Sequence, residues 1–457
     1  MAGTNLSKLS AAGIGRKIGS GDLDPIEVAG YFLDRVSSCP DQSVFLTVTA
    51  DRALREAEAS RRRRRNGSRL GILDGVPISF KDLIDVEDTV TTCGSLLFRD
   101  DPPAREDAPV VRRLCAAGMV CLGKTNLSEF AYSAIGMNPH FGTPLNPFCK
   151  GPPRIPGGSS SGAAVSVARG LAPAAIGTDT SGSVRIPASL CGLVGHHTSP
   201  GRIDRARVAT LSMSLDTVGS LAHCVEDCIL LDRVLRGEDA GAGIGEPVHI
   251  AKLSAIVPEN YACDDLDPDI ARHFETALEI LAAAGLQVER GPIDELDAFA
   301  RTRARHGTLV TAEAYYIFRD RLDDPRIGEN TATRLRNGEK MSAYDLLAIQ
   351  QTREALSISM AARLRPGKLL MMPTVPHGAP TIASLEENGE RFAEVNLRTM
   401  KNTSLGNFFG LCGVTLPCGQ DANGIPVGLL MCGPPGGDEG LLRAALAIER
   451  TLASVAA

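Results

Sequence analysis

Residues 156–199 read PGGSSSGAAVSVARGLAPAAIGTDTSGSVRIPASLCGLVGHHTS, a stretch dense in glycine and serine with no histidine before His196. A lysine, Lys81, follows the apolar run GVPISF about one supersecondary unit upstream. A hydroxyl nucleophile needs a base nearby, and a lysine is available here while a well-placed histidine is not. The stretch therefore indicates a serine nucleophile that is activated by lysine.

Strands and helices alternate on both sides of this stretch. Short apolar runs between turn residues predict strands, and apolar residues at helical spacing predict the helices between them. The predicted strands are 43–49, 75–80, 118–123, 172–179, 248–257 and 368–375, with VTLPC and IPVGLLMCG near the end. The predicted helices include 50–64, 107–117, 161–169, 268–284, 395–409 and 438–452, and 214–235 is expected to be a loop that enters a helix. This order is typical of an α/β protein with helices on both faces of a sheet.

The chain is expected to form one domain over residues 1–457. It contains no long Ser/Pro/Gly linker and no internal repeat, and its hydrophobic content of 43% is enough for a large core. Residues 293–363 are charged and mostly helical in pattern. We therefore expect residues 236–365 to form a mostly helical lobe that covers the substrate pocket.

The composition predicts a cytoplasmic protein that meets a small-molecule substrate. The net charge is −6 with both signs interspersed, which is not the pattern of a nucleic-acid-binding protein. The N-terminus lacks a signal pattern, and no uncharged run approaches the ~18 residues that span a bilayer. The 12 cysteines are scattered through apolar segments, as expected for reduced core residues. We expect no nucleic-acid and no membrane partner, and a homodimer is left open.

Two local clusters allow other interpretations. Arg61–Arg65 extend a helix with charges four residues apart, which favours a solvated helix face over an RNA- or membrane-binding tract. His223, Cys224 and Cys228 could face a metal ion from one helix, but a fourth ligand is missing and helical cysteines are usually core residues. Neither a metal ion nor a cofactor is expected.

Lys81 stands at the end of an apolar strand, flanked by Phe80 and Leu83. Burial would disfavour its ammonium form and lower its pKa, so that it could act as a base near neutral pH. Asp82 and Asp85 would oppose this shift unless they point elsewhere. A lysine at a strand end is also commonly a surface residue, so Lys81 decides nothing alone.

Two glycine-rich turns lie downstream of Lys81. Residues 157–162 precede an Ala-rich helix, so this turn could bind an anion, cap the helix or relay protons through one of its serines. It has neither the Lys-Ser/Thr ending of a P-loop nor the spacing of a dinucleotide fingerprint. Residues 177–185, GTDTSGSVR, could expose consecutive amides around a side-chain oxygen, as a nucleophile and its oxyanion hole require. The alternative is a structural turn capped by Asp179.

Taken in order, LDGVPISFKD, GKTNLSEFA, PGGSSSG and GTDTSGSVRIPASLCGLVG resemble the phrases of the amidase signature family of serine hydrolases. The resemblance runs from the N-terminal helices to the closing GIPVGLLMCG and so covers nearly the whole chain. It implies a large twisted mixed β-sheet sandwiched between α-helices. It also implies hydrolysis of a carboxylic amide, at a C–N bond other than a peptide, without a metal ion or cofactor.

The resemblance places the family's catalytic triad on Lys81, Ser159 and Ser183. Lys81 would be the base, Ser159 a bridging serine held with a cis peptide bond, and Ser183 the nucleophile that carries the acyl group. Activity should then rise into alkaline pH, because an ammonium group cannot accept a proton.

The resemblance also implies residues that support the triad. The oxyanion amides correspond to Thr180, Ser181, Gly182 and Ser183, and the supporting residues to Asp179, Arg185 and Ser160. The chain departs from the family pattern at Ser181, where a glycine is common, and at His196-His197, where Leu-Lys is usual. We expect the two histidines to be structural.

Several functions are compatible with such a site. An amide hydrolase that releases ammonia or an amine is the main hypothesis, with a carbamate (urethane) or biuret/urea-type C–N bond as the alternative. Another alternative is the glutamine-hydrolysing component of a glutamine-dependent tRNA amidotransferase, its A chain, although that component usually has Gln where Ile186 stands. A non-catalytic scaffold is disfavoured because the lysine and both serines are present. We expect residues 123–140, 300–350 and 373–410 to line the pocket.

Overall fold

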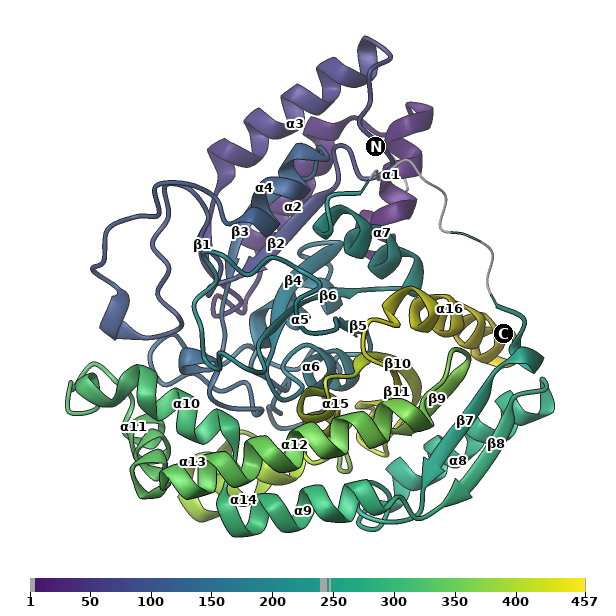
Figure 1. Ribbon diagram of the computed structural model, residues 1–457. Coiled ribbons are helices and arrows are strands. Elements are labelled where there is room, and N and C mark those ends of the chain that lie inside the picture. Colours follow the sequence, from purple (N-terminus) through teal and green to yellow (C-terminus); the bar gives the residue numbers. More distant parts are fainter. Residues whose placement is uncertain (1–4, 239–244, 246–247, 457) are drawn as a thin grey trace.

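The computed structural model describes residues 5–238, 245 and 248–456, and an eleven-stranded sheet runs through the molecule (Figure 1). The strand order is β1-β3-β2-β4-β6-β5-β10-β11-β9-β7-β8. Strand β2 pairs in parallel with β3 and β4, and β7 pairs in parallel with β8 and β9, while the other pairs are antiparallel. The strands are β1 (Phe45–Val48), β2 (Pro77–Lys81), β3 (Val120–Thr125), β4 (Ala174–Asp179), β5 (Val194–His197), β6 (Thr217–Ala222), β7 (Ser254–Pro258), β8 (Gln287–Gly291), β9 (Lys368–Pro373), β10 (Cys412–Gln420) and β11 (Pro426–Gly433).

Helices cover both faces of this sheet, which confirms the predicted α/β class with a large mixed sheet. α7, α8 and α16 pack on one face of its central strands, and α5 and α6 pack on the other. The helices are α1 (Ala11–Ser20), α2 (Pro25–Ser37), α3 (Ala50–Arg65), α4 (Pro109–Ala116), α5 (Ser161–Ala168), α6 (Arg185–Leu190), α7 (Val225–Leu235), α8 (Pro268–Ala283), α9 (Asp294–His306), α10 (Leu309–Phe318), α11 (Glu329–Leu335), α12 (Ala343–Arg363), α13 (Ala383–Glu386), α14 (Gly389–Thr399), α15 (Thr403–Phe409) and α16 (Asp438–Ala456).

Strand β4 illustrates why the central strands read as continuous apolar runs. Ala174 and Ile176 belong to the large core beneath α7 and α16, whereas Ala175 packs with the residues of α5. A strand that is covered on both faces needs apolar or small residues at every position. The run APAAIGTD meets that demand until its polar end, Thr178 and Asp179.

Strands β2 and β4 end at the same edge of the sheet. They pair in parallel, with Ser79 opposite Ala175 and Phe80 opposite Ile176. In open α/β sheets the loops beyond the carboxyl ends of parallel strands hold the ligand. Lys81, the last residue of β2, therefore lies beside the loop that follows β4.

The segment 214–235 differs from the prediction, because it contains strand β6 before helix α7. Residues 217–222 read TVGSLA and are buried between β4 and β5, so they show no polar alternation that would mark a strand. Strand β5 was not predicted either, and all of its residues, Val194–His197, are likewise buried.

Two further boundaries differ. Strand β7 begins at Ser254, because residues 250–252 form a 3-10 turn. The single helix predicted at 395–409 is the end of α14 and the whole of α15, separated at residues 400–402. The Asn402 side chain interrupts it by donating hydrogen bonds to the carbonyls of Ala262 and Pro373.

The segment 236–365 contributes both helices and strands among its described residues. It holds α8 to α12 together with β7 and β8, which extend the sheet at one edge (Figure 1). In residues 5–238, 245 and 248–456, none of the helices combines the length and hydropathy that a membrane span requires.

Candidate active site

Lys81 ends strand β2 and is fully buried. Its Nζ lies 2.6 Å from Oγ of Ser159 and 2.9 Å from Oγ1 of Thr178. Thr178 stands on β4, so the parallel pairing of β2 and β4 brings the lysine and the threonine together. The amine therefore points into the serine turn and not toward solvent.

Burial lowers the pKa of Lys81 to about 7, although the charges of Asp216 and Asp179 act in the opposite direction. The free-energy cost of removing the ammonium group from water is larger than the stabilisation that the charges of these two carboxylates provide at their distance. A substantial share of Lys81 is therefore an uncharged amine at neutral pH.

The two carboxylates that neighbour Lys81 in sequence point elsewhere. Asp82 forms an ion pair with the buried Lys124, with 2.6 Å between Oδ1 and Nζ. Asp85 accepts a hydrogen bond of 2.7 Å from the Thr91 hydroxyl. Because each has its own partner, neither Asp82 nor Asp85 restores the charge of Lys81.

The turn that carries Ser159 lies directly against Ser183. The Ser160 amide donates a hydrogen bond of 3.2 Å to the Ser183 carbonyl, and the Ser128 amide donates one of 3.1 Å to the Ser159 carbonyl. The peptide bond between Gly158 and Ser159 is cis. Ser183 itself is 6% exposed and lines a cavity. The structure thus brings Lys81 into contact with Ser159, and the Ser159 turn into contact with Ser183.

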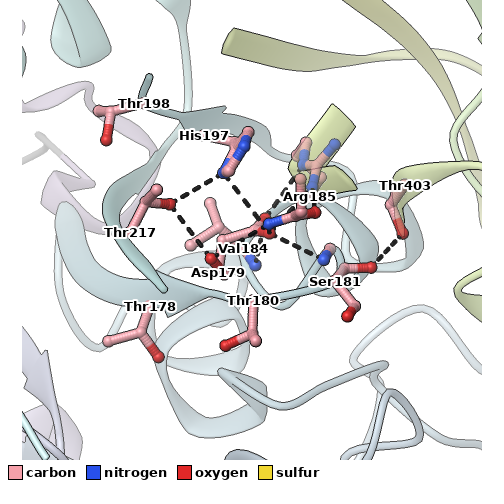
Figure 2. A network of polar contacts seen from close by, with 12 residues as sticks. Thr178, Asp179, Thr180, Ser181, Val184, Arg185, His197, Thr198, Thr217 and Thr403 are labelled. Atoms are coloured by element: carbon pink, nitrogen blue, oxygen red, sulfur yellow. Dashed lines mark hydrogen bonds and ion pairs between the residues drawn. The ribbon is translucent and has the colours of Figure 1, made fainter. Parts of the chain in front are cut away.

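Asp179, the last residue of β4, organises the loop that follows it (Figure 2). Its carboxylate accepts hydrogen bonds from the amides of Gly182 (2.8 Å) and Val184 (3.2 Å) and pairs with Arg185, whose Nη2 lies 2.9 Å from Oδ1. Asn407 of α15 bonds both Asp179 and Arg185. Burial alone would raise the pKa of Asp179, but Arg185 and the other donors hold it well below its usual range.

The loop is also fastened from the opposite side at Gly182. Gly182 has φ 124°, and a Cβ atom there would lie 2.1 Å from Oγ1 of Thr403. The Thr403 hydroxyl donates a hydrogen bond of 2.6 Å to the Ser181 carbonyl (Figure 2). Only glycine allows this approach, so the chain requires it at this position.

Most of the loop amides remain available to a substrate. The amides of Thr180, Ser181 and Ser183 have no hydrogen-bond acceptor within the described part of the chain. The Gly182 amide, which the resemblance included among the oxyanion donors, is already bound by Asp179. The side chain of Thr180 is fixed by a hydrogen bond of 2.6 Å to Asp216.

His197 joins this network, with Nδ1 3.5 Å from Oδ1 of Asp179 (Figure 2). Among the described residues, neither His196 nor His197 forms a hydrogen bond or ion pair with Lys81 or Ser183. The Thr217 hydroxyl donates to the Asp179 carbonyl and lies 2.9 Å from Nδ1 of His197, which assigns the proton to that nitrogen (Figure 2). Burial, assisted by Arg185, lowers the pKa of His197 to about 3, so the ring is neutral. Nε2 of His196 lies 3.5 Å from Asp438.

A cavity of about 220 Å³ opens over Ser183. We call Lys81, Ser159 and residues 178–185 the floor of the site. The cover is formed by those parts of α9–α12, α14, α15 and their connecting turns that line the cavity. All three segments that were expected to line the pocket contribute to it. Leu211 and Leu215 also line it, and no pattern in the chain pointed to them.

No metal site is found in the part of the chain that the structure describes, where no three His, Cys, Asp or Glu side chains are grouped to hold an ion. His223, Cys224 and Cys228 do not form such a group there. All 12 cysteines are free thiols.

Thr178, Thr403 and Asn407 are among the residues of the site that were not identified from the sequence. Thr178 has a signal in principle, because it precedes Asp179 at the end of a strand that is parallel to β2. Thr403 and Asn407 have none, since they reach the loop across 222 and 228 residues of chain.

With this geometry established, the chain can be assigned to a class. The family model described as Amidase matches residues 27–442. The chain belongs to the amidase family and is an amide-hydrolysing enzyme of the amidase signature type. The resemblance noted in the sequence is thereby confirmed.

Two curated relatives illustrate the range of the family. The chain is 38% identical over 389 residues to a 2-amino-5-chloromuconic acid deaminase of Comamonas testosteroni, covering 84% of this chain and 83% of that protein. It is 32% identical over 481 residues to the A chain of a glutamyl-tRNA(Gln) amidotransferase of Roseiflexus castenholzii, covering 98% of this chain and 96% of that protein.

Solved structures share the fold over nearly the full length. A crystal structure of an amidase superposes with a TM-score of 0.84 at 29% identity and covers 97% of this chain and 99% of its own. A chain from a vestigial protein complex, linked to the origins of an s-triazine catabolic enzyme, has a TM-score of 0.85 at 29% identity and covers 97% and 98%. The amidase signature fold is therefore confirmed.

Proposed function

We propose that this hydrolase cleaves the C–N bond of a small carboxylic amide through an acyl-enzyme on Ser183 and releases ammonia or an amine. The observation that carries the proposal is the fully buried Lys81, whose Nζ lies 2.6 Å from Oγ of Ser159. A lysine with a pKa of about 7 that contacts a serine hydroxyl is available as a neutral base under ordinary conditions.

The proton path runs from Ser183 through Ser159 to Lys81. When the amine is neutral, the Ser159 hydroxyl donates to Nζ, and Nζ donates to Thr178. As the Ser183 oxygen attacks the substrate carbonyl, its proton passes to Ser159 and the Ser159 proton passes to Lys81.

Collapse of the tetrahedral intermediate breaks the C–N bond. The protonated Lys81 returns a proton through Ser159 to the leaving nitrogen, because expulsion of an amide anion is prohibitive. Water then attacks the acyl carbon, gives its proton to the same path and regenerates Ser183. This chemistry calls for no metal ion or cofactor, so a chelator should leave the rate unchanged.

The free amides of Thr180, Ser181 and Ser183 are the proposed oxyanion donors. Asp179, Gly182 and the α15 contacts hold their loop before the substrate arrives. A donor that is fixed in advance needs no reorganisation during the reaction, and one such donor contributes about 2.7–4 kcal/mol to the transition state.

The cavity favours a small substrate. Its volume of about 220 Å³ is below the roughly 300–1,000 Å³ of sites for drug-sized ligands. The similarity to a 2-amino-5-chloromuconic acid deaminase supports loss of an amino group from a compact molecule. A carbamate or a biuret/urea-type C–N bond could be cleaved by the same steps and is the alternative substrate class.

The second candidate is the A chain of a tRNA amidotransferase, which the 32% identity across 98% of the chain favours. Ile186 argues against it, since this residue lines the cavity where such proteins usually place glutamine. Glutamine hydrolysis together with co-purification of a second protein of the amidotransferase would establish this function in place of the first.

The test of the main proposal compares the wild type with Ser183→Ala. A panel of short aliphatic amides, aryl amides, carbamates and ureas gives the rates, and a fluorophosphonate probe reports the nucleophile. We expect the probe to label the wild type and not Ser183→Ala, and hydrolysis of every active substrate to be lost with the label. Hydrolysis that persists in a folded Ser183→Ala protein would exclude Ser183 as the nucleophile.

We further propose that the enzyme acts in the cytoplasm on a small molecule that diffuses to it. The support is the set of free cysteines, which a reducing compartment preserves.

A further inference from the structure

The charge of the cavity points to the kind of substrate it accepts. Among the described residues that line it, the only two with a charged side chain are Arg303 and Arg334, and none is acidic. Arg303 lies close enough to Tyr261 that its charge opposes the rise that burial causes in the pKa of the tyrosine. An enclosed site that carries positive charge without a compensating carboxylate attracts an anion.

Arg334, near the end of α11, has no charged partner of its own. Its Cζ lies 4.7 Å from the ring centre of Tyr132 and 5.8 Å from that of Phe392. Within the described residues no carboxylate pairs with the guanidinium and no hydrogen-bond acceptor contacts it. Arg334 is half-buried, and this burial lowers the pKa of its guanidinium.

The contrast with Arg336, two residues further on, is direct. Arg336 donates to the Leu322 carbonyl and lies 2.7 Å from Asp323, so its donors are used within the protein. A guanidinium has five N–H donors, which point outward in the plane of the group. An aromatic ring that stacks on its flat face does not accept these hydrogen bonds. The fork of Arg334 is therefore free to bind a ligand in the cavity.

We propose that Arg334 binds a carboxylate of the substrate. The substrate would then be a small molecule with a carboxylic acid at one end and, at the other, the C–N bond that is cleaved at Ser183. This inference rests on the proposed function for the cleaved bond. A planar guanidinium fork matches the two coplanar oxygens of a carboxylate. Asn337, one turn after Arg334, and Thr311 add neutral polar groups to the same cavity.

The experiment measures ligand binding to Ser183→Ala, in which no turnover disturbs the result. The probes are succinate, glutarate and adipate, each compared with its uncharged diamide and with inorganic phosphate, by titration calorimetry. We expect at least one acid to bind ten-fold or more tightly than its diamide. The substitution Arg334→Gln should remove a charge-assisted bidentate contact. The affinity for that acid should then fall by about 10- to 100-fold, while the affinity for the diamide should change little.

Two further variants make the result specific. Arg334→Lys should recover only part of the affinity, because an ammonium group lacks the fork. Arg336→Gln, which alters a cation outside the cavity, should bind the acid as tightly as the parent protein. In the active enzyme, Arg334→Gln should raise the KM of a monoamide of a dicarboxylic acid far more than that of the diamide.

The proposal is overturned if all three acids bind no better than their diamides, if phosphate binds better than every acid, or if the preference survives in Arg334→Gln. Because the comparison of acid with diamide uses an intact Arg334, it stands even if Arg334→Gln does not fold. Failure of the proposed function would show differently, as hydrolysis by Ser183→Ala with the acid preference unchanged.

Discussion

The floor and the cover of the site are built in opposite ways. In the floor, Lys81, Asp179 and Arg185 are fully buried, and each is held by hydrogen bonds to other parts of the chain. In the cover, Arg334 has no carboxylate or hydrogen-bond partner among the described residues and contacts only aromatic rings. Helix α12, which contributes Ile349 to the cover, exposes large apolar side chains at positions that do not line the cavity, with Tyr344 at 67% and Ile358 at 68%. If the proposed function holds, the floor fixes the reaction and the cover can change to select the substrate.

The floor derives its rigidity from a buried network in which several residues share one carboxylate. Asp179 serves two amides, one guanidinium and Asn407 at once. In such a network the loss of one partner leaves others buried without a hydrogen bond, which costs more than the mean value of a single bond. Substitutions in the floor should therefore have large effects, and those in the cover should mostly change affinity.

The largest expected effect is that of Lys81→Ala. Removal of the base should lower kcat by about 10⁴-fold, at the upper end for general base catalysis, because no other side chain hydrogen-bonds the Ser159 hydroxyl among the described residues. Steady-state kinetics measures the loss, and circular dichroism should show an unchanged fold. A folded variant that keeps a tenth of the activity would remove Lys81 from the reaction.

Asp179→Asn should act mainly on stability. It leaves Arg185 as a buried cation without its carboxylate, which should lower the free energy of unfolding by about 3–5 kcal/mol. Urea denaturation monitored by circular dichroism gives the value. Asp324→Asn is the matched control, because Asp324 pairs with Arg326 at the surface and its loss should leave the denaturation midpoint in place. Equal midpoints for the two variants would contradict the role of Asp179 in the floor.

Ser159→Ala should lower kcat less than Lys81→Ala, by about 100-fold. The base is still present, and water can occupy the place of the missing hydroxyl and pass the proton at a lower rate. The ratio of the two losses comes from parallel assays with one substrate. If Ser159→Ala proves more damaging than Lys81→Ala, Ser159 is not a relay.

The pH dependence gives the smallest effect. Because burial lowers the pKa of Lys81 to about 7, kcat/KM should fall tenfold for each pH unit below 7 and level off above about 8. The neutral His197, with a pKa of about 3, cannot produce this limb. A profile that declines above neutrality while the protein stays folded would show that a neutral lysine is not the base.

Much of the floor could be predicted from the sequence, because its residues belong to short contiguous phrases. Lys81, Ser159 and Ser183 were placed by matching those phrases, and the strand that ends at Lys81 was visible as an apolar run. The sequence could not show which loop amides are free and which are already hydrogen-bonded. Only the three-dimensional structure shows that the Gly182 amide donates to the Asp179 carboxylate.

The cover was predicted only as a set of segments. Arg334 stands in a charged helical region where many arginines look alike, and its free guanidinium depends on which carboxylates lie near it in space. Strand β6 was missed for a related reason, because its small residues reflect close packing against β4 and β5 and not an alternating pattern.

The uncharged amine inside the sheet has a consequence for the whole protein. Lys81 titrates near 7 when folded, against an ordinary value of 10.5, so between these pH values the unfolded chain binds the extra proton. The contribution of Lys81 to the free energy of unfolding is therefore fully present above about pH 10.5, where the amine is neutral in both states. It is lost as the pH falls toward 7, because the unfolded chain alone gains the proton. A rise from pH 7 to about 8 should thus make the enzyme faster, and a further rise toward pH 10.5 should, through this one group, still make it harder to unfold.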